Sequence, residues 1–322
     1  MSGMYPLRFR PILRRYLWGG RQLEQLGKTL GDGDDYAESW EIVDRGSDHS
    51  TVAAGPLAGK TLHELLESDS ESLLGRHAGL TQFPLLIKFL DAQRALSLQV
   101  HPNDEQAARL VPPDLGKTEA WVILAAEPHS FLLAGLRRGV DRDMLARELA
   151  RETCELCVER IEPKPGDCFY LPAGVVHALG PGLLVAEIQQ ASDTTFRLFD
   201  WNRPGPDGNP RELHVDEAMA AIDFEHGPVA PQVPQPSNHS HVEQLVTCDK
   251  FVLDRWRFDS PQPVGGDQRF HVLIVLDGAV DVAGDAAGPP LEAGGVVLLP
   301  AALGPVELQP HAESVLLDAY LP

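Results

Sequence analysis

The feature that most constrains the fold is a short pattern that occurs twice, at residues 165–177 and at residues 293–305. Each copy contains a glycine, then a small or acidic residue, then four largely apolar residues, then a Pro-Ala pair. This order is typical of a tight turn that leads into a short strand and a second turn. Because a repeated segment indicates a repeated structural unit, we predict a mostly β protein built from two related barrels.

The two copies differ at one position that bears on chemistry. The first copy ends with His177, whereas the aligned residue of the second copy is Pro305. A proline side chain has no atom that binds a metal, so we expect one active unit and one structural unit. We place the catalytic unit, with an N-terminal extension, at residues 1–225 and a degenerate, metal-free unit at residues 242–322. The proline-rich residues 226–241 form the predicted linker.

Length and composition limit the classes of protein to consider. The chain has 322 residues, which is long enough for two domains, and its 29 glycines and 27 prolines favour turns over long helices. A formal net charge of −20 argues against nucleic acid or an anionic membrane as a partner, since both need a clustered basic surface. We expect a cytoplasmic protein, because no apolar run has the length of a membrane span and the N-terminus lacks a signal-peptide core.

Two segments are predicted as the main additional helices. Residues 61–74 carry leucines at helical spacing after Thr61, whose side chain can cap a helix N-terminus. Residues 141–159 also have a helical pattern, which Pro163 ends. Cys154 and Cys157 lie in this second segment, and we interpret them as core thiols because no second cysteine pair follows.

The chemistry of the chain is concentrated in residues 97–121. Ser97, Gln99 and His101 alternate with apolar residues, so a strand would place these three polar side chains on one face. Lys117 and Glu119 are also two residues apart, directly before an apolar run. Such alternation usually marks a solvated strand face, but glutamine, histidine and glutamate are all competent metal ligands.

His177 adds a third strong ligand, about 60 residues downstream of this stretch. A lone histidine in a β protein is usually an ordinary core or surface residue. Here Gly174 leaves room beside it, and the preceding turn places it at the start of a predicted strand.

Further charged residues lie in apolar surroundings. Lys88 interrupts a buried-strand pattern at residues 84–90, so it is either paired or faces a cavity. Glu187 alternates with apolar neighbours and can face the same interior. Arg197 is set in an aromatic strand, where it forms an ion pair with Asp200 or Glu187 or serves as an anion receptor.

These stretches together resemble the type I mannose-6-phosphate isomerases, also called phosphomannose isomerases, which are zinc enzymes of the cupin superfamily. The resemblance covers most of residues 5–225. It is carried by ESWE at 38–41, SLQVHP at 97–102, GKTEAW at 116–121, PAGVVHAL at 172–179 and RLFDW at 197–201, all in the family's order. The chain departs from the family in having Thr118 where many relatives carry proline, in lacking a large helical insertion, and in its divergent C-terminal part.

The resemblance implies two cupin (jelly-roll) barrels with a few additional helices. It also implies one Zn²⁺ per chain, with metal ligands at Gln99, His101, Glu119 and His177. It assigns catalytic roles to Lys117, Glu187 and Arg197, and substrate binding to Ser97, Lys117 and Arg197.

The implied reaction interconverts mannose 6-phosphate and fructose 6-phosphate through a cis-enediol. Such a reaction needs a base, and Lys117 and Glu187 are the two candidates. The expected partner is a small sugar phosphate, with no nucleic acid and no membrane, and the chain is expected to be a monomer or a weak homo-oligomer. Two other classes stay open: a metal-dependent cupin oxygenase and a non-catalytic sugar-binding cupin.

Overall fold

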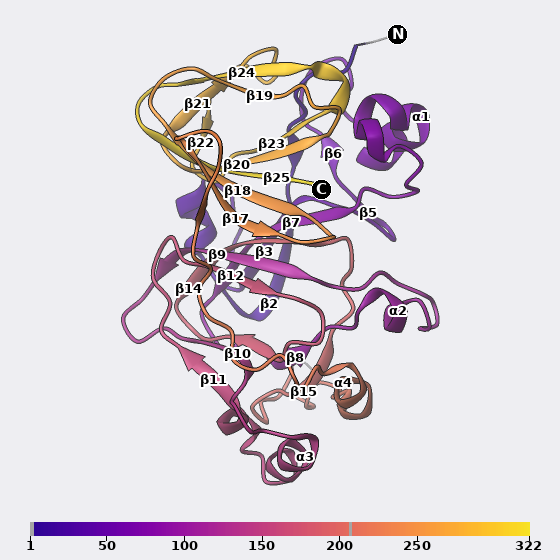
Figure 1. Cartoon of the computed structure of the whole chain (residues 1–322), viewed down its shortest axis with the longest axis vertical. Helices are drawn as coiled ribbons and strands as arrows, with labels where there is room; N and C mark the ends of the chain where they lie inside the picture. Colours follow the sequence, from indigo (N-terminus) through magenta and orange to yellow (C-terminus); the bar gives the residue numbers. More distant parts are fainter. Residues whose placement is uncertain (1–2, 206–207) are drawn as a thin grey trace.

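The protein consists mainly of antiparallel β-strands, as predicted, with a few short helices. A computed structural model describes residues 3–205 and 208–322 (Figure 1). Its strands form two six-stranded sheets, one five-stranded sheet and one four-stranded sheet, besides two small two-stranded ribbons. Each six-stranded sheet packs on one of the smaller sheets and so makes a sandwich.

The first sandwich is built from residues up to 199. Its six-stranded sheet has the order β12 (Cys168–Leu171), β9 (Glu119–Ala126), β14 (Leu183–Gln190), β7 (Leu85–Ala92), β3 (Tyr36–Ile42) and β2 (Ile12–Gly20). Its five-stranded sheet has the order β11 (Val158–Ile161), β10 (Leu132–Leu136), β13 (His177–Leu179), β8 (Leu98–Val100) and β15 (Phe196–Phe199). Trp121, Leu132 and Phe169 are buried between the two sheets.

The second sandwich repeats this arrangement. Its six-stranded sheet has the order β16 (Gln235–Pro236), β17 (Val242–Thr247), β18 (Val252–Phe258), β25 (Ser314–Tyr320), β20 (His271–Asp277) and β23 (Val296–Leu299). Its four-stranded sheet has the order β19 (Gln262–Gly265), β24 (Pro305–Pro310), β21 (Ala279–Val282) and β22 (Leu291–Glu292). The repeat seen in the sequence is confirmed, because its two apolar segments form β12 and β23, each at the edge of its six-stranded sheet.

The two six-stranded sheets pack back to back, so that the sandwiches share one large core. Phe83 and Phe270 meet there with ring centroids 4.7 Å apart. The backbones of Leu7 and Leu298 exchange two hydrogen bonds, of 2.8 and 2.9 Å, and so tie the N-terminal segment to the second sandwich. Figure 1 shows the second sandwich, in orange and yellow, above the first.

Residues 226–241, the predicted linker, run along the first sandwich before they enter the second. The backbone N–H of Val229 donates to Ala134, and that of Gln232 donates to Cys168. The same segment contributes β16 to the second six-stranded sheet. The connection is thus fixed by hydrogen bonds along its length, and the domain limits at 225 and 242 stay a prediction.

The helices match the sequence in part. The helix α1 (Leu62–Leu74) begins at the predicted cap Thr61, which accepts a hydrogen bond from the Glu64 N–H. The helix α3 (Arg142–Ala150) is shorter than the predicted helix at 141–159, which is wrong beyond Ala150. Glu152 has a positive φ of 60°, which ends the helix. The residues that follow form the 3-10 turn η3 (Cys154–Cys157), whose buried free thiols confirm the core interpretation, and then β11.

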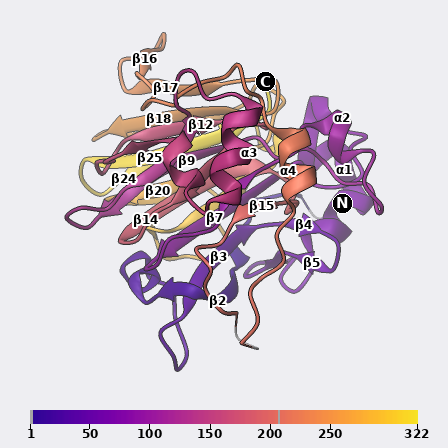
Figure 2. The same ribbon diagram turned by 90° about the horizontal axis from the view of Figure 1, so that it is seen from below.

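The remaining elements are short. They are η1 (Gln22–Leu26), β1 (Phe9–Arg10), β4 (Asp44–Arg45), β5 (Asp48–His49), β6 (Thr51–Val52), η2 (Gly75–His77), α2 (Asp104–Ala107), α4 (Val215–Ala221) and η4 (Ala301–Leu303). Leu145 of α3 and Ala218 of α4 pack on the five-stranded sheet, and Figure 2 shows both helices at the end of the molecule seen from below. Within the ranges 3–205 and 208–322, no helix is long and apolar enough to cross a membrane.

The shared core predicts that the two sandwiches unfold together. We expect Phe270→Ala to lower the free energy of unfolding by about 3–5 kcal/mol, because it leaves a cavity where Phe83 now packs. Urea unfolding followed by tryptophan fluorescence and by far-UV circular dichroism measures this. Leu156→Ala is the control, since Leu156 is 59% exposed, and it is expected to change stability by less than about 0.5 kcal/mol. Two separate transitions, only one of them moved by Phe270→Ala, would contradict the shared core.

Candidate metal centre and active site

Three potential metal ligands converge at one end of the first sandwich. His101 follows β8, Glu119 begins β9 and His177 begins β13, and their ligand atoms all lie within 4.8 Å of one another. Glu119 Oε1 is 3.2 Å from His177 Nε2, and Glu119 Oε2 is 3.5 Å from His101 Nε2. The structure therefore brings together three residues that the sequence singled out as ligands.

Gln99 joins this cluster through strand pairing. It is the register partner of His177 across β8 and β13, and its Nε2 lies 3.4 Å from His177 Nε2. Ser97, on the same face of the strand, donates a hydrogen bond of 3.2 Å to Gln99 Oε1. The alternation in the sequence thus corresponds to one polar face that points at the cluster.

Both imidazoles are oriented by backbone carbonyls. His101 Nδ1 is 2.9 Å from the Thr194 carbonyl oxygen, and His177 Nδ1 is 2.9 Å from that of Val175. A carbonyl only accepts, so each Nδ1 carries the proton and each Nε2 presents its lone pair to Glu119. Burial lowers the pKa of His177 to about 4 and that of His101 well below its usual value, which keeps both rings neutral at pH 7.

The turn before His177 helps to place it. Gly174 has a positive φ of 90°, and its N–H donates to the His101 carbonyl oxygen at 2.9 Å. A side chain at this position would be strained, because L residues rarely adopt such a φ. The glycine thereby links the backbone of one candidate ligand, His101, to the turn that carries another, His177.

Glu119 is the centre of the cluster, and its two carboxylate oxygens can accept hydrogen bonds or bind a cation. It is completely buried, and neither carboxylate oxygen forms a hydrogen bond with any residue that the structure describes. Lys117 Nζ lies at ion-pair distance, 3.1 Å from Oε2 and 3.3 Å from His101 Nε2. Burial raises the pKa of Glu119 to about 8. A buried carboxylate without hydrogen bonds, flanked by two imidazole lone pairs, fits a bound cation with nitrogen and oxygen ligands.

A pocket opens beside the cluster. Gln99 lines it together with Ser97, Lys117, Glu187 and Arg197, so the structure brings all four predicted active-site residues to one cavity. The other lining residues are Tyr16, Trp18, Glu38, Lys88, Leu90, Leu96, Trp121, Asp193, Thr195 and Arg211.

Glu187 and Lys88 form a buried ion pair in the wall of this pocket. Lys88 Nζ is 3.4 Å from Glu187 Oε2 and 3.6 Å from Glu38 Oε2, so the lysine is paired and also faces the cavity. Trp121 Nε1 donates a 2.8 Å hydrogen bond to Glu187 Oε1. Burial opposes ionisation of Glu187, but Lys88 and Lys117 hold its pKa at about 2.

Arg197 takes no part in the ion pairs that its neighbours form. Asp200 is paired instead with Arg203 at 2.6 Å and with Arg211 at 2.5 Å. Within residues 3–205 and 208–322 we find no ion pair of Arg197 with Asp200 or Glu187, and its Nε has no hydrogen-bond partner. A half-buried guanidinium that lines a pocket without a carboxylate partner favours the second interpretation, an anion receptor.

Some lining residues were not identified from the sequence. Arg211 and Asp193 lie in polar, turn-rich segments without periodicity, which offer no signal of a shared site. Glu38 lies in one of the recognised motifs but had no assigned role.

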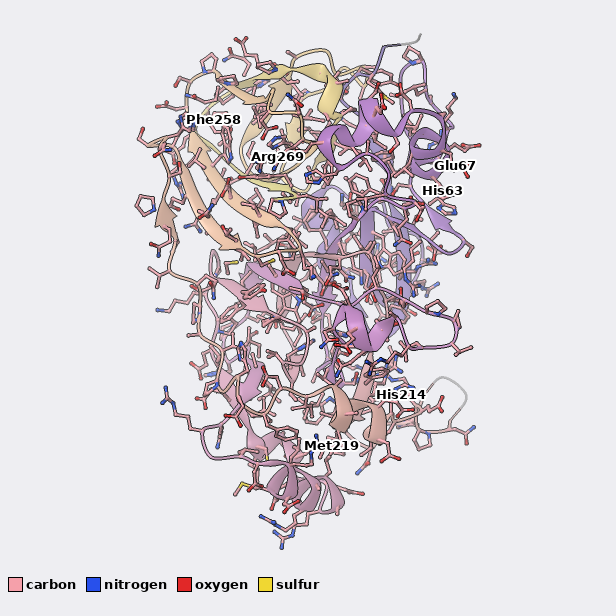
Figure 3. All side chains as sticks on the ribbon, turned by 45° about the vertical axis from the view of Figure 1, so that its right-hand side comes forward. His63, Glu67, His214, Met219, Phe258 and Arg269 are labelled. Carbon is pink, nitrogen blue, oxygen red and sulfur yellow. The ribbon has the colours of Figure 1, made fainter. Side chains whose placement is uncertain are left out.

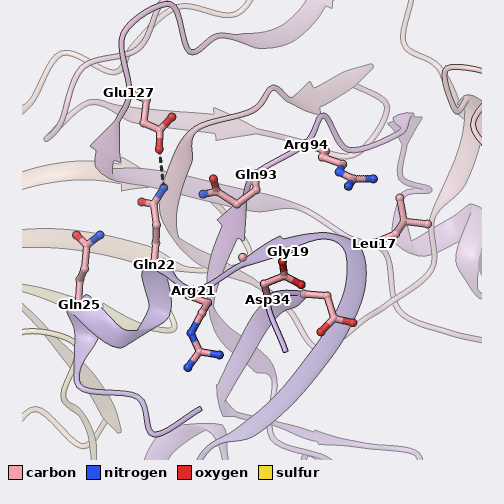
Figure 4. Close-up of a pocket in the computed structure, with 11 residues that line it drawn as sticks. Leu17, Gly19, Arg21, Gln22, Gln25, Asp34, Gln93, Arg94 and Glu127 are labelled. Carbon is pink, nitrogen blue, oxygen red and sulfur yellow. Dashed lines mark hydrogen bonds between the residues drawn. The ribbon is translucent and has the colours of Figure 1, made fainter. Parts of the chain in front are cut away.

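A second hollow, shown in Figure 4, lies between β2 and η1, where Gln22 donates a 3.3 Å hydrogen bond to Glu127. None of the four predicted ligands lines this hollow.

A second group of potential ligands lies at the start of α1. His49 Nδ1 and His63 Nδ1 are 2.8 and 3.0 Å from the same buried oxygen of Asp44. Its other oxygen accepts the Phe83 N–H at 2.8 Å. Figure 3 shows His63 on the outward side of α1, next to Glu67. Because every short contact here is a satisfied hydrogen bond, we interpret the group as an anchor for the helix.

Comparisons with known proteins agree with this geometry. Residues 7–125 match the model of the phosphomannose isomerase type I catalytic domain. The chain is 33% identical over 317 residues to mannose-6-phosphate isomerase ManA of Bacillus subtilis (strain 168), covering 96% of this chain and 98% of that protein. The chain belongs to the type I phosphomannose isomerase family.

Other members of the family are similar over most of their length. A mannose-6-phosphate isomerase of Streptococcus mutans is 30% identical over 276 residues, which is 85% of each chain. The crystal structure of the mannose 6-phosphate isomerase from Bacillus subtilis superposes with a TM-score of 0.89 at 30% identity and covers 98% of this chain and 99% of that one. The family assignment therefore applies to the whole chain, including the divergent second sandwich.

For this member of the phosphomannose isomerase family, the cluster predicts one metal site that depends on Glu119. We expect purified, dialysed protein to hold about one equivalent of divalent metal, and Glu119→Gln to hold almost none, because an amide cannot supply the negative charge. Elemental analysis by mass spectrometry measures both. Glu187→Gln is the matched control, since it removes a buried carboxylate of the same pocket that lies outside the cluster. Equal metal loss in both variants would contradict a site centred on Glu119.

Proposed function

We propose that the protein is a zinc-dependent aldose–ketose isomerase that interconverts mannose 6-phosphate and fructose 6-phosphate through a cis-enediol intermediate. One observation carries the proposal: the buried Glu119 carboxylate, 3.1 Å from Lys117, has no hydrogen-bond partner among the described residues and lies between two neutral imidazoles, next to a pocket that Lys117 and Arg197 line. The printed names of the relatives, mannose-6-phosphate isomerases, support the choice of substrate. A cytoplasmic location and a monomeric or weakly associating state stay predictions from the sequence.

Zinc fits the donor set. Gln99, His101, Glu119 and His177 would hold one Zn²⁺ per chain, and two imidazoles with one carboxylate are typical zinc ligands. When bound, the ion supplies a Lewis acid that polarises the carbonyl oxygen of the sugar. Because only one of the four ligands carries a charge, the site keeps a net positive charge.

The cationic side chains of the pocket suit a phosphorylated substrate. Arg197 Nε has no hydrogen-bond partner in the described part of the chain. Arg211 lines the same pocket, but it forms an ion pair with Asp200. A planar guanidinium binds phosphate oxygens through two parallel hydrogen bonds, and it also stabilises a negative oxygen that develops during enolisation. We assign Arg197 to one of these anions and Ser97 to a sugar hydroxyl.

Lys117 is the better placed of the two candidate bases. Glu187 is held by Trp121 and Lys88, and its pKa of about 2 makes it a weak base near neutral pH. The Lys117 amine lines the pocket and lies within 3.3 Å of His101 and Glu119. In the proposed mechanism Lys117 acts in its neutral form, which a cation held by Glu119 would favour. It takes the proton from C2 of the aldose and returns it to C1, while the proton of the C2 hydroxyl passes to O1 and Glu187 keeps Lys88 and Trp121 in place.

The proposed function predicts activity that requires metal. We expect a coupled assay to detect interconversion of mannose 6-phosphate and fructose 6-phosphate, loss of that activity after chelation, and its recovery with Zn²⁺. Serial addition of Zn²⁺, Fe²⁺ and Mg²⁺ to the stripped protein is the control for metal identity. Oxygen consumption that depends on iron, without isomerisation, would overturn the proposal in favour of an oxygenase.

The choice of base is tested by isotope exchange. We expect Lys117→Ala to lower the rate of solvent-deuterium incorporation at the reacting carbon by about 10²–10⁴-fold, because it removes the group that moves the proton. Glu187→Gln keeps the shape and the hydrogen bond from Trp121, so it is expected to reduce exchange much less. Nuclear magnetic resonance of the sugar phosphate in D₂O gives both rates. Exchange that persists in Lys117→Ala but stops in Glu187→Gln would reverse the assignment.

A further inference from the structure

The second sandwich has a pocket where the first has its active site. The strand registers show which residues correspond. Leu171 of β12 pairs with Glu119, and Leu299 at the same point of β23 pairs with His271, so His271 occupies the position of Glu119. Two residues further along β20, Leu273 pairs with Asp318, and two residues after Glu119 on β9, Trp121 pairs with Glu187. Asp318 therefore occupies the position of Glu187.

On the neighbouring strand, the two sandwiches carry side chains of opposite charge at the corresponding position. Lys88 pairs with Glu187 in the first sandwich, and Asp254 pairs with Asp318 in the second. The cation of the active site is thus replaced by a carboxylate, and Pro305 replaces the ligand His177 at the start of β24. The second pocket therefore lacks the counterparts of Lys88 and His177 but has kept buried polar residues.

His271 is fixed in this pocket by carboxylates. Its Nδ1 is 2.9 Å from both oxygens of Asp318, and its Nε2 is 3.2 Å from Asp267 Oδ1. Both ring nitrogens are therefore occupied, and the ring has no lone pair for a metal. Although burial opposes the charge, the two carboxylates raise the pKa of His271 to about 10, so the group is a permanent internal cation at neutral pH.

Two buried polar atoms on β18 have no partner. Asp254 and Trp256 are 8% and 9% exposed, and neither Asp254 Oδ1 nor Trp256 Nε1 forms a hydrogen bond with a described residue. The other oxygen of Asp254 accepts a 2.8 Å hydrogen bond from the Tyr320 hydroxyl. An unsatisfied buried polar group destabilises a fold by about 1–3 kcal/mol, so two of them on one strand face need an explanation.

Both residues line a cavity of about 360 Å³ together with His271, Asp318 and Tyr320. This volume lies within the range of roughly 300–1,000 Å³ that small-molecule sites occupy. Figure 3 shows Arg269, which also lines the cavity, within the second sandwich and far from α4 of the first.

We propose that the second sandwich binds a neutral polyhydroxylated compound, of the class of free sugars and sugar alcohols, in this cavity. A hydroxyl group both donates and accepts, so it satisfies the Asp254 acceptor and the Trp256 donor together. An ammonium ion only donates and leaves Trp256 unsatisfied. A phosphate ester only accepts hydrogen bonds, so it leaves the Asp254 acceptor unsatisfied and lies against the carboxylates of Asp254 and Asp318, although the cations Arg269 and His271 also line the cavity.

Isothermal titration calorimetry on the full chain tests this. The probes are D-mannose, D-fructose and D-mannitol, and we expect at least one to bind with a roughly millimolar dissociation constant. Asp254→Ala is expected to weaken that binding about tenfold or more, and Trp256→Phe several-fold, because each removes one unsatisfied polar atom. Tyr320→Phe is the matched control, since it breaks the same tyrosine–aspartate hydrogen bond but keeps the Asp254 carboxylate, and it is expected to change affinity little.

A further variant distinguishes binding in the second sandwich from binding of the same probe at the active site of the first. We expect Arg197→Ala to keep the affinity for the neutral probe, because Arg197 lies in the first sandwich. If Asp254→Ala does not fold, as judged by its thermal unfolding, Trp256→Phe decides, since it keeps the aromatic ring. The proposal is overturned if no probe binds at millimolar concentrations, if the heat is unchanged in Trp256→Phe and in any folded Asp254→Ala, or if it disappears in Arg197→Ala.

Discussion

The structure of the site depends on one buried acidic group, the carboxyl group of Glu119. A carboxylate removed from water and left without hydrogen bonds is strongly unfavourable unless a cation compensates it. The surrounding groups fit this need: two imidazoles turn their Nε2 atoms toward Glu119 because backbone carbonyls occupy their Nδ1 atoms, and Lys117 stands 3.1 Å away. These contacts come from three strands and the loops beside them. The jelly-roll sandwich matters to function mainly because it holds these segments in register.

Duplication explains why the same scaffold carries two different sets of side chains. The order of strands in the six-stranded sheets corresponds one for one, and the edge strands β12 and β23 come from the repeated sequence. Because the backbone fixes where each side chain points, single replacements are enough to change the chemistry of a pocket. Aspartate at the position of Lys88 and proline at that of His177 remove a cation and a candidate metal ligand without altering the fold. The back-to-back core then gives the second copy a structural role that does not depend on its pocket.

Most of the candidate metal cluster was predictable from the sequence because alternation with a period of two residues indicates which side chains share a strand face. Ser97, Gln99 and His101 follow this rule, and the motifs around His177 supplied the long-range partner. Other features depend on tertiary contacts that no local pattern reports. Lys88 left two interpretations open, paired or facing a cavity, and the structure shows both at once. The helix predicted to extend to residue 159 was too long because apolar spacing continues past Ala150, whereas the backbone turns at Glu152 and the later residues pack as an edge strand. Arg211 reaches the pocket from a segment without any pattern.

The distribution of charge reconciles an acidic chain with an anionic substrate. The net charge of −20 is carried mostly by carboxylates that are not buried, and solvent and salt screen such charges over about 10 Å. Inside the pocket, the charge available to a ligand depends on which cations already form ion pairs with neighbouring carboxylates. Lys88 is neutralised by Glu38 and Glu187, and Arg211 shares Asp200 with Arg203, so these cations have little charge left for a ligand. Arg197 differs because none of its neighbours in the described part of the chain pairs with it. In our proposal, recognition of the sugar phosphate therefore depends on a single unpaired guanidinium and on the metal centre, and not on a broad positive surface.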